Sequence, residues 1–222
     1  MIVAIDGPAG AGKSSISRRL AERLGFAFLD TGAMYRAVAL AALRRGLGTD
    51  AVEQIAQLAH ERTIDFDGVH TLLDGEDVSA AIRTSEVSAA VHLAADNVAV
   101  RRRLVELQRQ IAAGRDIVTE GRDQGTVAFP QAECKVFLTA SRRERARRRF
   151  EELVSRGEPI TFDEVLAQQD ERDQRDAKRP VGALVKAGDA VEVLTDGLTL
   201  EQVVERLEGI VAAKVRASKE LC

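Results

Sequence analysis

The stretch that decides the fold is Ile2–Ser14, which reads IVAIDGPAGAGKS. Its first part, Ile2–Asp6, is a short apolar run of the kind that forms a buried strand, and the glycine-rich segment Gly7–Gly12 follows directly. From Lys13 to Leu24 the apolar side chains recur at helical spacing. A strand, a glycine-rich turn and a helix in this order predict an α/β fold that opens on a parallel sheet.

Residues 7–14 match the pattern G-x-x-x-x-G-K-[ST] in full, with a strand before and a helix after. In such a loop the backbone N–H groups converge on phosphate oxygens, and the helix dipole adds to the attraction. We therefore expect a nucleoside triphosphate with Mg²⁺, with Lys13 on the β and γ oxygens and the Ser14 hydroxyl on the metal. The loop alone does not separate a kinase from an ATPase or a GTPase. The residues expected to bind ATP are Gly7, Pro8, Ala9, Gly10, Ala11, Gly12, Lys13, Ser14 and Ser15.

The same alternation of strand and helix continues along the chain. Ala27–Asp30, Asp116–Glu120 and Cys134–Leu138 are expected to be further strands, and Ser85–Ala113 is expected to be helical. Residues 63–83 mix apolar side chains with Asp and Gly, which predicts short antiparallel strands in a small insert. Three helix starts show capping-box spacing: Ser141 with Glu144, Thr161 with Glu164, and Thr199 with Gln202.

Composition narrows the class of protein further. The chain has 222 residues, 45% of them hydrophobic, which suits one domain with a sizeable core. Its net charge of −3 argues against a nucleic-acid-binding protein. No stretch reaches the roughly 18 apolar residues of a membrane span. Cys134 and Cys222 suggest neither a disulfide framework nor a four-thiolate zinc site, so we expect a cytoplasmic protein.

A second set of phosphate-directed groups follows the loop. Arg36 and Arg122 each come just after a predicted strand, in DTGAMYR and EGRD, where open α/β sheets bind their ligands. Arginine and Mg²⁺ neutralise the charge that spreads over oxygens during phosphoryl transfer, so this set favours a kinase for a phosphorylated acceptor. A guanine-nucleotide switch would carry an Asn-Lys-x-Asp motif, but the single Asn97 is followed by Val98.

Five stretches, in this order and spacing, resemble the bacterial cytidylate kinases over nearly the whole chain. Among them, GEDV…IRT and GRD-x-GT…FP distinguish this family from other nucleoside monophosphate kinases. The stretches are IDGPAGAGKSS at 5–15, LDTGAMYRA at 29–37, LDGEDVSAAIRT at 73–84, EGRDQGTVAFP at 120–130 and ERDQRDAKR at 171–179.

The resemblance implies one P-loop kinase domain over residues 1–222. Within it, residues 36–100 would form an acceptor-binding region that contains the insert, and residues 148–157 a short lid. Arg36 and Arg122 would hold the acceptor phosphate, and Arg148 or Arg149 of the lid would reach the transferring phosphoryl group. The remaining substrate-binding residues that it implies are Thr31, Arg101, Asp123 and Arg179 at the cytosine, and His92, Arg172 and Asp176 at the ribose.

These roles agree with the chemistry of the base. Asp123 can accept a hydrogen bond from the N4 amino group of cytosine, and an arginine can donate to N3 and O2. The chain departs from the usual family pattern at His92, where serine is common, and at Gln124, beside two of the implied site residues. The preference among CMP, dCMP and UMP therefore stays open.

The reaction we expect is in-line transfer of the γ-phosphoryl group of ATP to CMP, and also to dCMP, with no covalent enzyme intermediate and no general base. Lid closure would exclude water from the transferring group. We expect a monomer whose partners are these substrates, without nucleic acid or membrane. Two alternatives remain: a nucleotide-binding sensor that keeps the fold without turnover, and a kinase for another small acceptor such as UMP.

Overall fold

A computed structural model describes residues 1–67 and 70–220 of the chain. Positions 68–69 of the expected insert, and Cys222, lie outside the described residues. The chain divides into two compact units, one formed by residues 1–28 and those from 115 onward, the other by residues 29–114. Each unit has its own elements and is described by itself.

The first unit is built on a parallel sheet. Among the described residues, a five-stranded sheet has the order β2-β6-β1-β7-β8, and its strand β2 continues past residue 28 into the second unit. The strands are β1 (Ile2–Asp6), β2 (Ala27–Asp30), β6 (Ile117–Gly121), β7 (Cys134–Thr139) and β8 (Val191–Leu194). β1 pairs in parallel with β6 and β7, and β7 pairs in parallel with β8. The predicted α/β fold with a parallel sheet is thereby confirmed.

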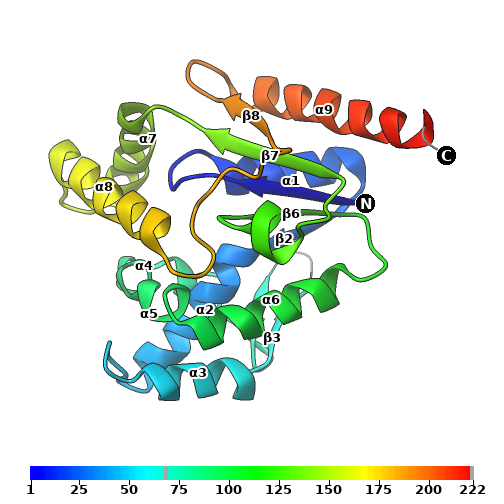
Figure 1. The fold of residues 1–222 in the computed structure, drawn as a ribbon. Coiled ribbons are helices and arrows are strands. Elements are labelled where there is room, and N and C mark those ends of the chain that lie inside the picture. The colour runs from blue at the N-terminus through cyan, green and yellow to red at the C-terminus, as the bar shows by residue number, and fades with distance from the viewer. Residues whose placement is uncertain (68–69, 221–222) are drawn as a thin grey trace. The chain divides into compact units, whose positions relative to one another are not determined.

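Two helices of this unit pack on the sheet. α1 (Lys13–Leu24) and α9 (Leu200–Glu220) pack against each other and against the sheet (Figure 1). Their buried side chains share one core with the central strands, including Leu20 of α1, Leu207 of α9 and Val136 of β7. Because aromatic residues make up only 4% of the chain, this core is mostly aliphatic.

Two further helices of the first unit, α7 (Arg142–Ser155) and α8 (Phe162–Lys178), form a pair with a small core of their own. Phe150 and Phe162 meet there edge to face, with ring centroids 6.1 Å apart. The expected capping box at the start of α8 is present: Thr161 Oγ1 accepts from the Glu164 amide, and the Glu164 carboxylate accepts from the Thr161 amide.

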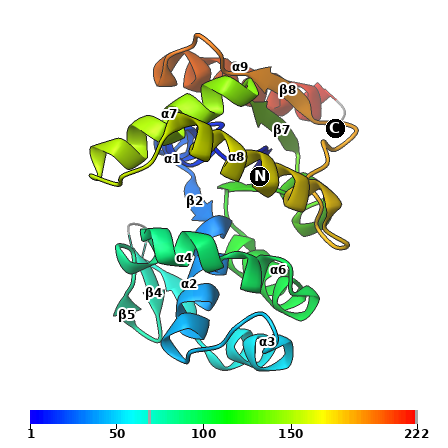
Figure 2. The same cartoon turned by 90° about the vertical axis from the view of Figure 1, so that its left-hand side faces the viewer.

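The second unit has α2 (Thr31–Arg44) at its centre. The helices α3 (Val52–Glu61), α4 (Ser85–Ala90), α5 (His92–Ala95) and α6 (Val98–Ala112) all contact α2, and Figure 2 shows several of them around it. Such contacts on several sides explain why α2 buries a long run of residues, from Ala37 to Ala42.

The expected insert forms a small antiparallel sheet in this unit. Strands β3 (Ile64–Phe66), β4 (Thr71–Leu73) and β5 (Glu76–Asp77) pair in sequence order, and a 3₁₀ turn at Ala81–Arg83 follows. This confirms the prediction of short antiparallel strands within residues 63–83.

The helical structure expected over Ser85–Ala113 is confirmed, and it is divided into three helices, α4, α5 and α6. The break has a local cause: the Asn97 side chain accepts hydrogen bonds from the amides of Ala99 and Val100 and so caps a new helix. The Asn97 amide group also donates to Val52 O, at 2.8 Å, which ties the break to the start of α3.

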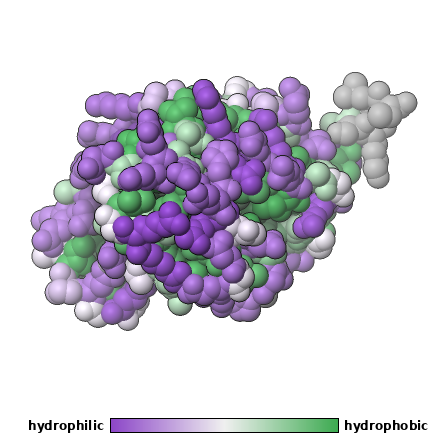
Figure 3. Space-filling model, turned by 90° about the horizontal axis from the view of Figure 1, so that it is seen from below, coloured by the Kyte–Doolittle hydropathy of each residue, from purple (hydrophilic) through white to green (hydrophobic). Residues whose placement is uncertain are grey.

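The surface seen in Figure 3 is mainly hydrophilic, with small hydrophobic areas between polar side chains. None of the helices in the described part of the chain has the length and apolar character needed to cross a membrane.

Candidate active site

The glycine-rich loop joins the end of β1 to the start of α1. Its conformation needs glycine at Gly7, where φ is 153° and a Cβ atom would lie 1.9 Å from the carbonyl oxygen of Leu138. Gly12, with φ of 88°, directly precedes Lys13, the first residue of α1. The loop therefore presents its backbone at the N-terminus of a helix, the arrangement that binds phosphate.

Lys13 is buried although it carries a charge. Only 6% of the residue is exposed, and its Nζ donates to the carbonyl oxygen of Pro8 within the loop, at 2.8 Å. Burial lowers the pKa of Lys13, and together with the nearby guanidinium groups of Arg122 and Arg172 it brings the pKa to about 7, against the opposing effect of the Glu120 and Asp6 carboxylates. Like charges gathered in this way are stabilised by an anion such as a polyphosphate.

Two acidic residues that the sequence reasoning missed end neighbouring strands beside the loop. Glu120 of β6 is 5% exposed and accepts a hydrogen bond from Ser14 Oγ at 2.5 Å. Oxygen ligands of this kind suit Mg²⁺, which usually takes one or two carboxylates together with phosphate oxygens. Ser14 and Glu120 therefore fit a Mg²⁺ ion that accompanies a nucleotide. Searched over the described residues alone, the chain holds no group of three or more His, Cys, Asp or Glu that could bind a metal by itself.

The second missed residue is Asp6, the last residue of β1. It is 5% exposed, and its two carboxylate oxygens accept from the backbone amides of Gln124 and Gly125, at 2.8 and 2.7 Å. Burial raises the pKa of Asp6 to about 6, against the lowering effect of these two hydrogen bonds and of Lys13. The signal that could have found both residues is an acidic side chain at the end of an apolar run, in IVAID and DIVTE.

Arg122, at the end of β6, lies in a buried ion-pair network. Its Nε donates to Asp176 Oδ2 at 2.7 Å, and Arg179 Nη2 donates to Asp176 Oδ1 at 2.6 Å. Burial raises the pKa of Asp176, but Arg122 and then Arg179 outweigh it and hold the pKa at about 2. The first unit thus brings together Arg122, Asp176, Arg179 and Arg172, all expected from the sequence to bind the acceptor. The adjoining Asp123 is only 2% exposed.

The other expected acceptor residues belong to the second unit. Thr31, the first residue of α2, is buried, and Arg36 Nη1 donates to Ser88 Oγ at 2.7 Å. Arg101 is buried, with its guanidinium over the Tyr35 ring at 5.2 Å and Nη1 bonded to Ala95 O. His92, at the start of α5, has Nδ1 2.7 Å from Ala89 O, so this nitrogen acts as the donor. The expected acceptor residues are therefore divided between the units.

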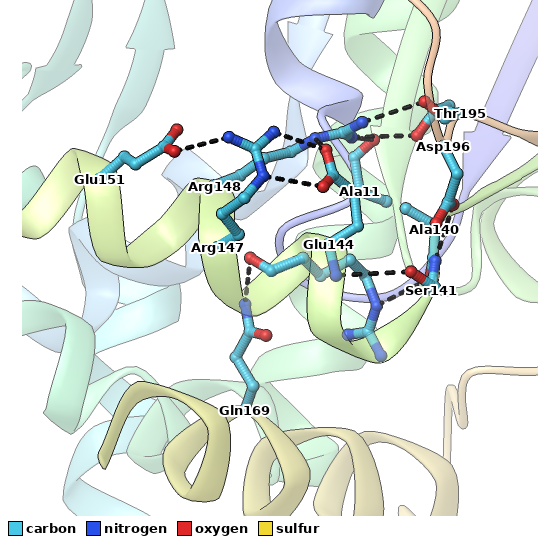
Figure 4. A network of polar contacts seen from close by, with 11 residues as sticks. Ala11, Ala140, Ser141, Glu144, Arg147, Arg148, Glu151, Gln169, Thr195 and Asp196 are labelled. Atoms are coloured by element: carbon cyan, nitrogen blue, oxygen red, sulfur yellow. Dashed lines mark hydrogen bonds and ion pairs between the residues drawn. The ribbon is translucent and has the colours of Figure 1, made fainter. Parts of the chain in front are cut away.

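The two arginines expected in the lid, Arg148 and Arg149 of α7, make different contacts. The Arg148 guanidinium donates hydrogen bonds to the hydroxyl and the carbonyl oxygen of Thr195, at 2.9 and 3.0 Å. It also donates to the Glu144 carboxylate (Figure 4). Its Nη1 also lies 3.5 Å from Ala11 O of the phosphate-binding loop. Arg149, by contrast, pairs with Glu152 of its own helix at 2.8 Å. Of the expected lid, residues 148–155 form the end of α7.

Comparison with known proteins gives the family. A sequence model described as Cytidylate kinase matches residues 3–213. A cytidylate kinase from Rhodopirellula baltica is 50% identical over 218 residues, which cover 98% of this chain and 95% of that protein. Another from Pelotomaculum thermopropionicum is 48% identical, covering 95% and 96% of the two chains.

Among solved structures, an uncharacterized protein from Eubacterium ventriosum aligns with a TM-score of 0.52 at 11% identity, covering 94% of this chain and 96% of that one. That likeness concerns the fold alone. The parallel sheet and the glycine-rich loop before α1 define a P-loop nucleotide-binding protein. Within that class, the chain belongs to the cytidylate kinase family, as its motifs predict.

Proposed function

We propose that the protein transfers the γ-phosphoryl group of ATP to CMP, and also to dCMP, to give ADP and CDP or dCDP. Family membership supports CMP as the acceptor, since relatives that match nearly the whole chain are named cytidylate kinases. The observation that carries the proposal is the cationic cluster of Lys13, Arg122 and Arg172, which joins the phosphate-binding loop to the acceptor motif within one unit.

On the donor side, the loop amides and Lys13 bind the polyphosphate, and an anion bound there offsets the repulsion that Arg122 and Arg172 exert on Lys13. Ser14 and Glu120 would hold a Mg²⁺ ion, and that ion would neutralise negative charge on the phosphates of ATP. The loop adds pre-set N–H donors, so little reorganisation is needed as charge develops.

On the acceptor side, Arg122 and Arg36 bind the 5′-phosphate of CMP. Asp176 orients Arg122 through their 2.7 Å hydrogen bond. Asp123 accepts from the N4 amino group of cytosine, while Thr31, Arg101 and Arg179 complete the base site. Arg172, Asp176 and His92 contact the ribose. Uracil reverses the donor pattern at N3 and the exocyclic group, so a buried site of this kind disfavours it.

The chemistry needs neither a covalent intermediate nor a general base, because a phosphate oxygen of CMP is already a competent nucleophile. The rate comes from holding the two phosphates in line and from stabilising the charge between them. A lid at residues 148–157, carrying Arg148 and Arg149, closes over the transferring group and excludes water. Residues 36–100 serve as the acceptor-binding region of a single kinase domain that works as a cytoplasmic monomer, with neither nucleic acid nor membrane as a partner.

The test is release of ADP from ATP and Mg²⁺, measured in parallel with CMP, dCMP, UMP and AMP. We expect rapid turnover with CMP and dCMP and little with UMP and AMP, and the ratio of CMP to dCMP reports on His92. Lys13→Ala should lower kcat by about 100-fold or more, as loss of a transition-state charge contact does.

Other outcomes would decide between the alternatives. ATP binding without turnover on any acceptor would favour a nucleotide sensor. Preferred turnover of UMP or AMP would keep the kinase class and refute the cytosine site. Near wild-type turnover by Lys13→Ala would contradict the mechanism. Lys219→Ala, which removes a lysine far along the sequence from every proposed site residue, is the matched control.

A further inference from the structure

Asp6 makes an unusual connection between the two halves of the site in the first unit. It ends β1 and directly precedes Gly7 of the phosphate-binding loop. Its carboxylate reaches across to the segment after Arg122 and Asp123, where it accepts from the amides of Gln124 and Gly125, at 2.8 and 2.7 Å. One side chain therefore links the donor loop to the acceptor motif.

The two amides open a short π-helical turn, Gln124–Ala128. The first N–H groups of a helix have no partner within the helix and need an acceptor from elsewhere. Asp123, in the capping position, makes no capping hydrogen bond with its side chain. Asp6 fills the capping role from another strand, and a carboxylate that accepts two N–H groups is a strong clamp.

The clamp fixes the backbone that follows Asp123. Val127 and Ala128 donate their amides to the Asp123 carbonyl oxygen, at 2.8 and 3.1 Å, so the turn closes back on this residue. The carboxylate also lies close to Gly125, where a Cβ atom would be 3.4 Å from Asp6 Oδ2, an ordinary contact distance. The position of the turn therefore depends on the two hydrogen bonds to Asp6.

The surroundings of Asp6 show that this arrangement is costly to keep. The residue is 5% exposed, and a carboxylate buried to that degree loses hydration that two amide hydrogen bonds only partly replace. A neutral residue at the end of β1 would avoid that loss.

We propose that Asp6 is a positioning residue of the acceptor site, which holds Arg122 and Asp123 in register with the phosphate-binding loop by clamping the Gln124–Gly125 backbone. This rests on the proposed function, in which Arg122 and Asp123 bind CMP. Asp6 touches neither substrate in this scheme. It sets the geometry between the bound phosphates, on which in-line transfer depends steeply.

The test replaces Asp6 by Asn, which keeps one acceptor oxygen and turns an NH₂ group toward the other backbone amide. We expect Asp6→Asn to raise KM for CMP by about 10-fold or more and to lower kcat, because displaced reacting groups lose rate steeply. KM for ATP, and the Mg²⁺ concentration for half-maximal rate, should change by less than about 3-fold. Asp163→Asn, at an exposed position in the first turn of α8, is the matched control.

A structural readout separates this proposal from the proposed function. Amide hydrogen exchange at Gln124 and Gly125 should speed up at least about 10-fold in Asp6→Asn, whatever the acceptor proves to be. If wild-type protein fails to phosphorylate CMP, the proposed function fails while the exchange rates still test the clamp. Asp6→Glu keeps the charge but displaces the carboxylate by one methylene group, and it should give the same selective loss toward CMP, which covers the case in which Asp6→Asn does not fold.

The proposal is overturned by unchanged exchange at both amides, by unchanged kinetics toward CMP, or by an equal loss toward ATP and CMP. An altered Mg²⁺ requirement in Asp6→Asn would also overturn it, because it would place Asp6 at the metal.

Discussion

At the scale of single residues, the first unit concentrates buried charge beside its glycine-rich loop. Lys13, Asp6 and Glu120 are each at least 94% buried. The ammonium group of Lys13 donates a hydrogen bond within the protein, and the two carboxylates each accept one. Such groups are rare in cores unless function requires them. Burial raises the pKa of Asp6 and lowers the pKa of Lys13, so the free energy of unfolding depends on pH.

Asp6 gives a pH dependence of unusual sign. Its pKa is raised from 3.8 to about 6, so between these pH values the unfolded chain has lost a proton that the folded protein keeps. Stability contributed by this proton is present below about pH 4 and is lost as the pH rises to about 6. Asp6→Asn cannot titrate. The free energy of unfolding of wild type minus that of Asp6→Asn should therefore fall by up to about 3 kcal/mol over this range.

The measurement is urea unfolding of both proteins at pH 4, 5, 6 and 7. A constant difference, or one that grows with pH, would show that the carboxyl group titrates normally in the folded protein.

At the scale of elements, local hydrogen bonds decide where helices begin. Asn97 divides a segment with continuous helical spacing, and Thr161 starts α8 with a reciprocal capping box. Both motifs satisfy amides that a helix cannot satisfy internally. The helix starts that carry site residues are therefore fixed by side chains outside the site.

Thr161→Ala removes the capping hydroxyl of α8, which carries Arg172 and Asp176. We expect a loss of about 1 kcal/mol in the free energy of unfolding, the usual cost of a lost N-cap. Urea unfolding at pH 7 measures it. Ser155→Ala is the control, since its exposed hydroxyl bonds only a helix carbonyl, that of Glu152. Equal effects of the two substitutions would argue against a capping contribution.

At the scale of the whole molecule, the expected site residues divide between two compact units. The residues expected to bind ATP all lie in the first unit. Those expected to bind the acceptor lie in both, with Arg122, Asp176 and Arg179 in the first and Arg36 and Arg101 in the second. The two substrates should therefore leave different footprints on the chain.

Amide hydrogen exchange can measure these footprints. ADP with Mg²⁺ should slow exchange in the loop, α1 and the end of β6, all in the first unit. CMP alone should slow exchange at residues 122–128 of the first unit and near Thr31, Arg36 and Arg101 of the second. Lys13→Ala should remove the ADP footprint and leave the CMP footprint. Protection by CMP confined to the first unit would refute the roles given to Arg36 and Arg101.

The sequence predicts some features well because their causes are local. The glycine-rich loop is recognisable since Gly7, Gly12 and Lys13 stand at fixed spacing between a strand and a helix. Asp6 and Glu120 carry only a weak signal, an acidic residue at the end of an apolar run, and the strand order is what places them beside the loop. β8 was missed for a related reason: its pairing with β7 depends on contacts between distant segments. Asn97, by contrast, carried a capping signal that was available.

Cys134 of β7 has a practical consequence. Its thiol is fully buried in the core of the sheet, and burial raises its pKa to about 11, so the folded protein keeps it from thiol reagents. In a Cys222→Ser background it is the sole thiol of the chain. The rate at which a thiol reagent modifies it would then act as a clock for rare openings of the central sheet, and would show whether a bound nucleotide slows them.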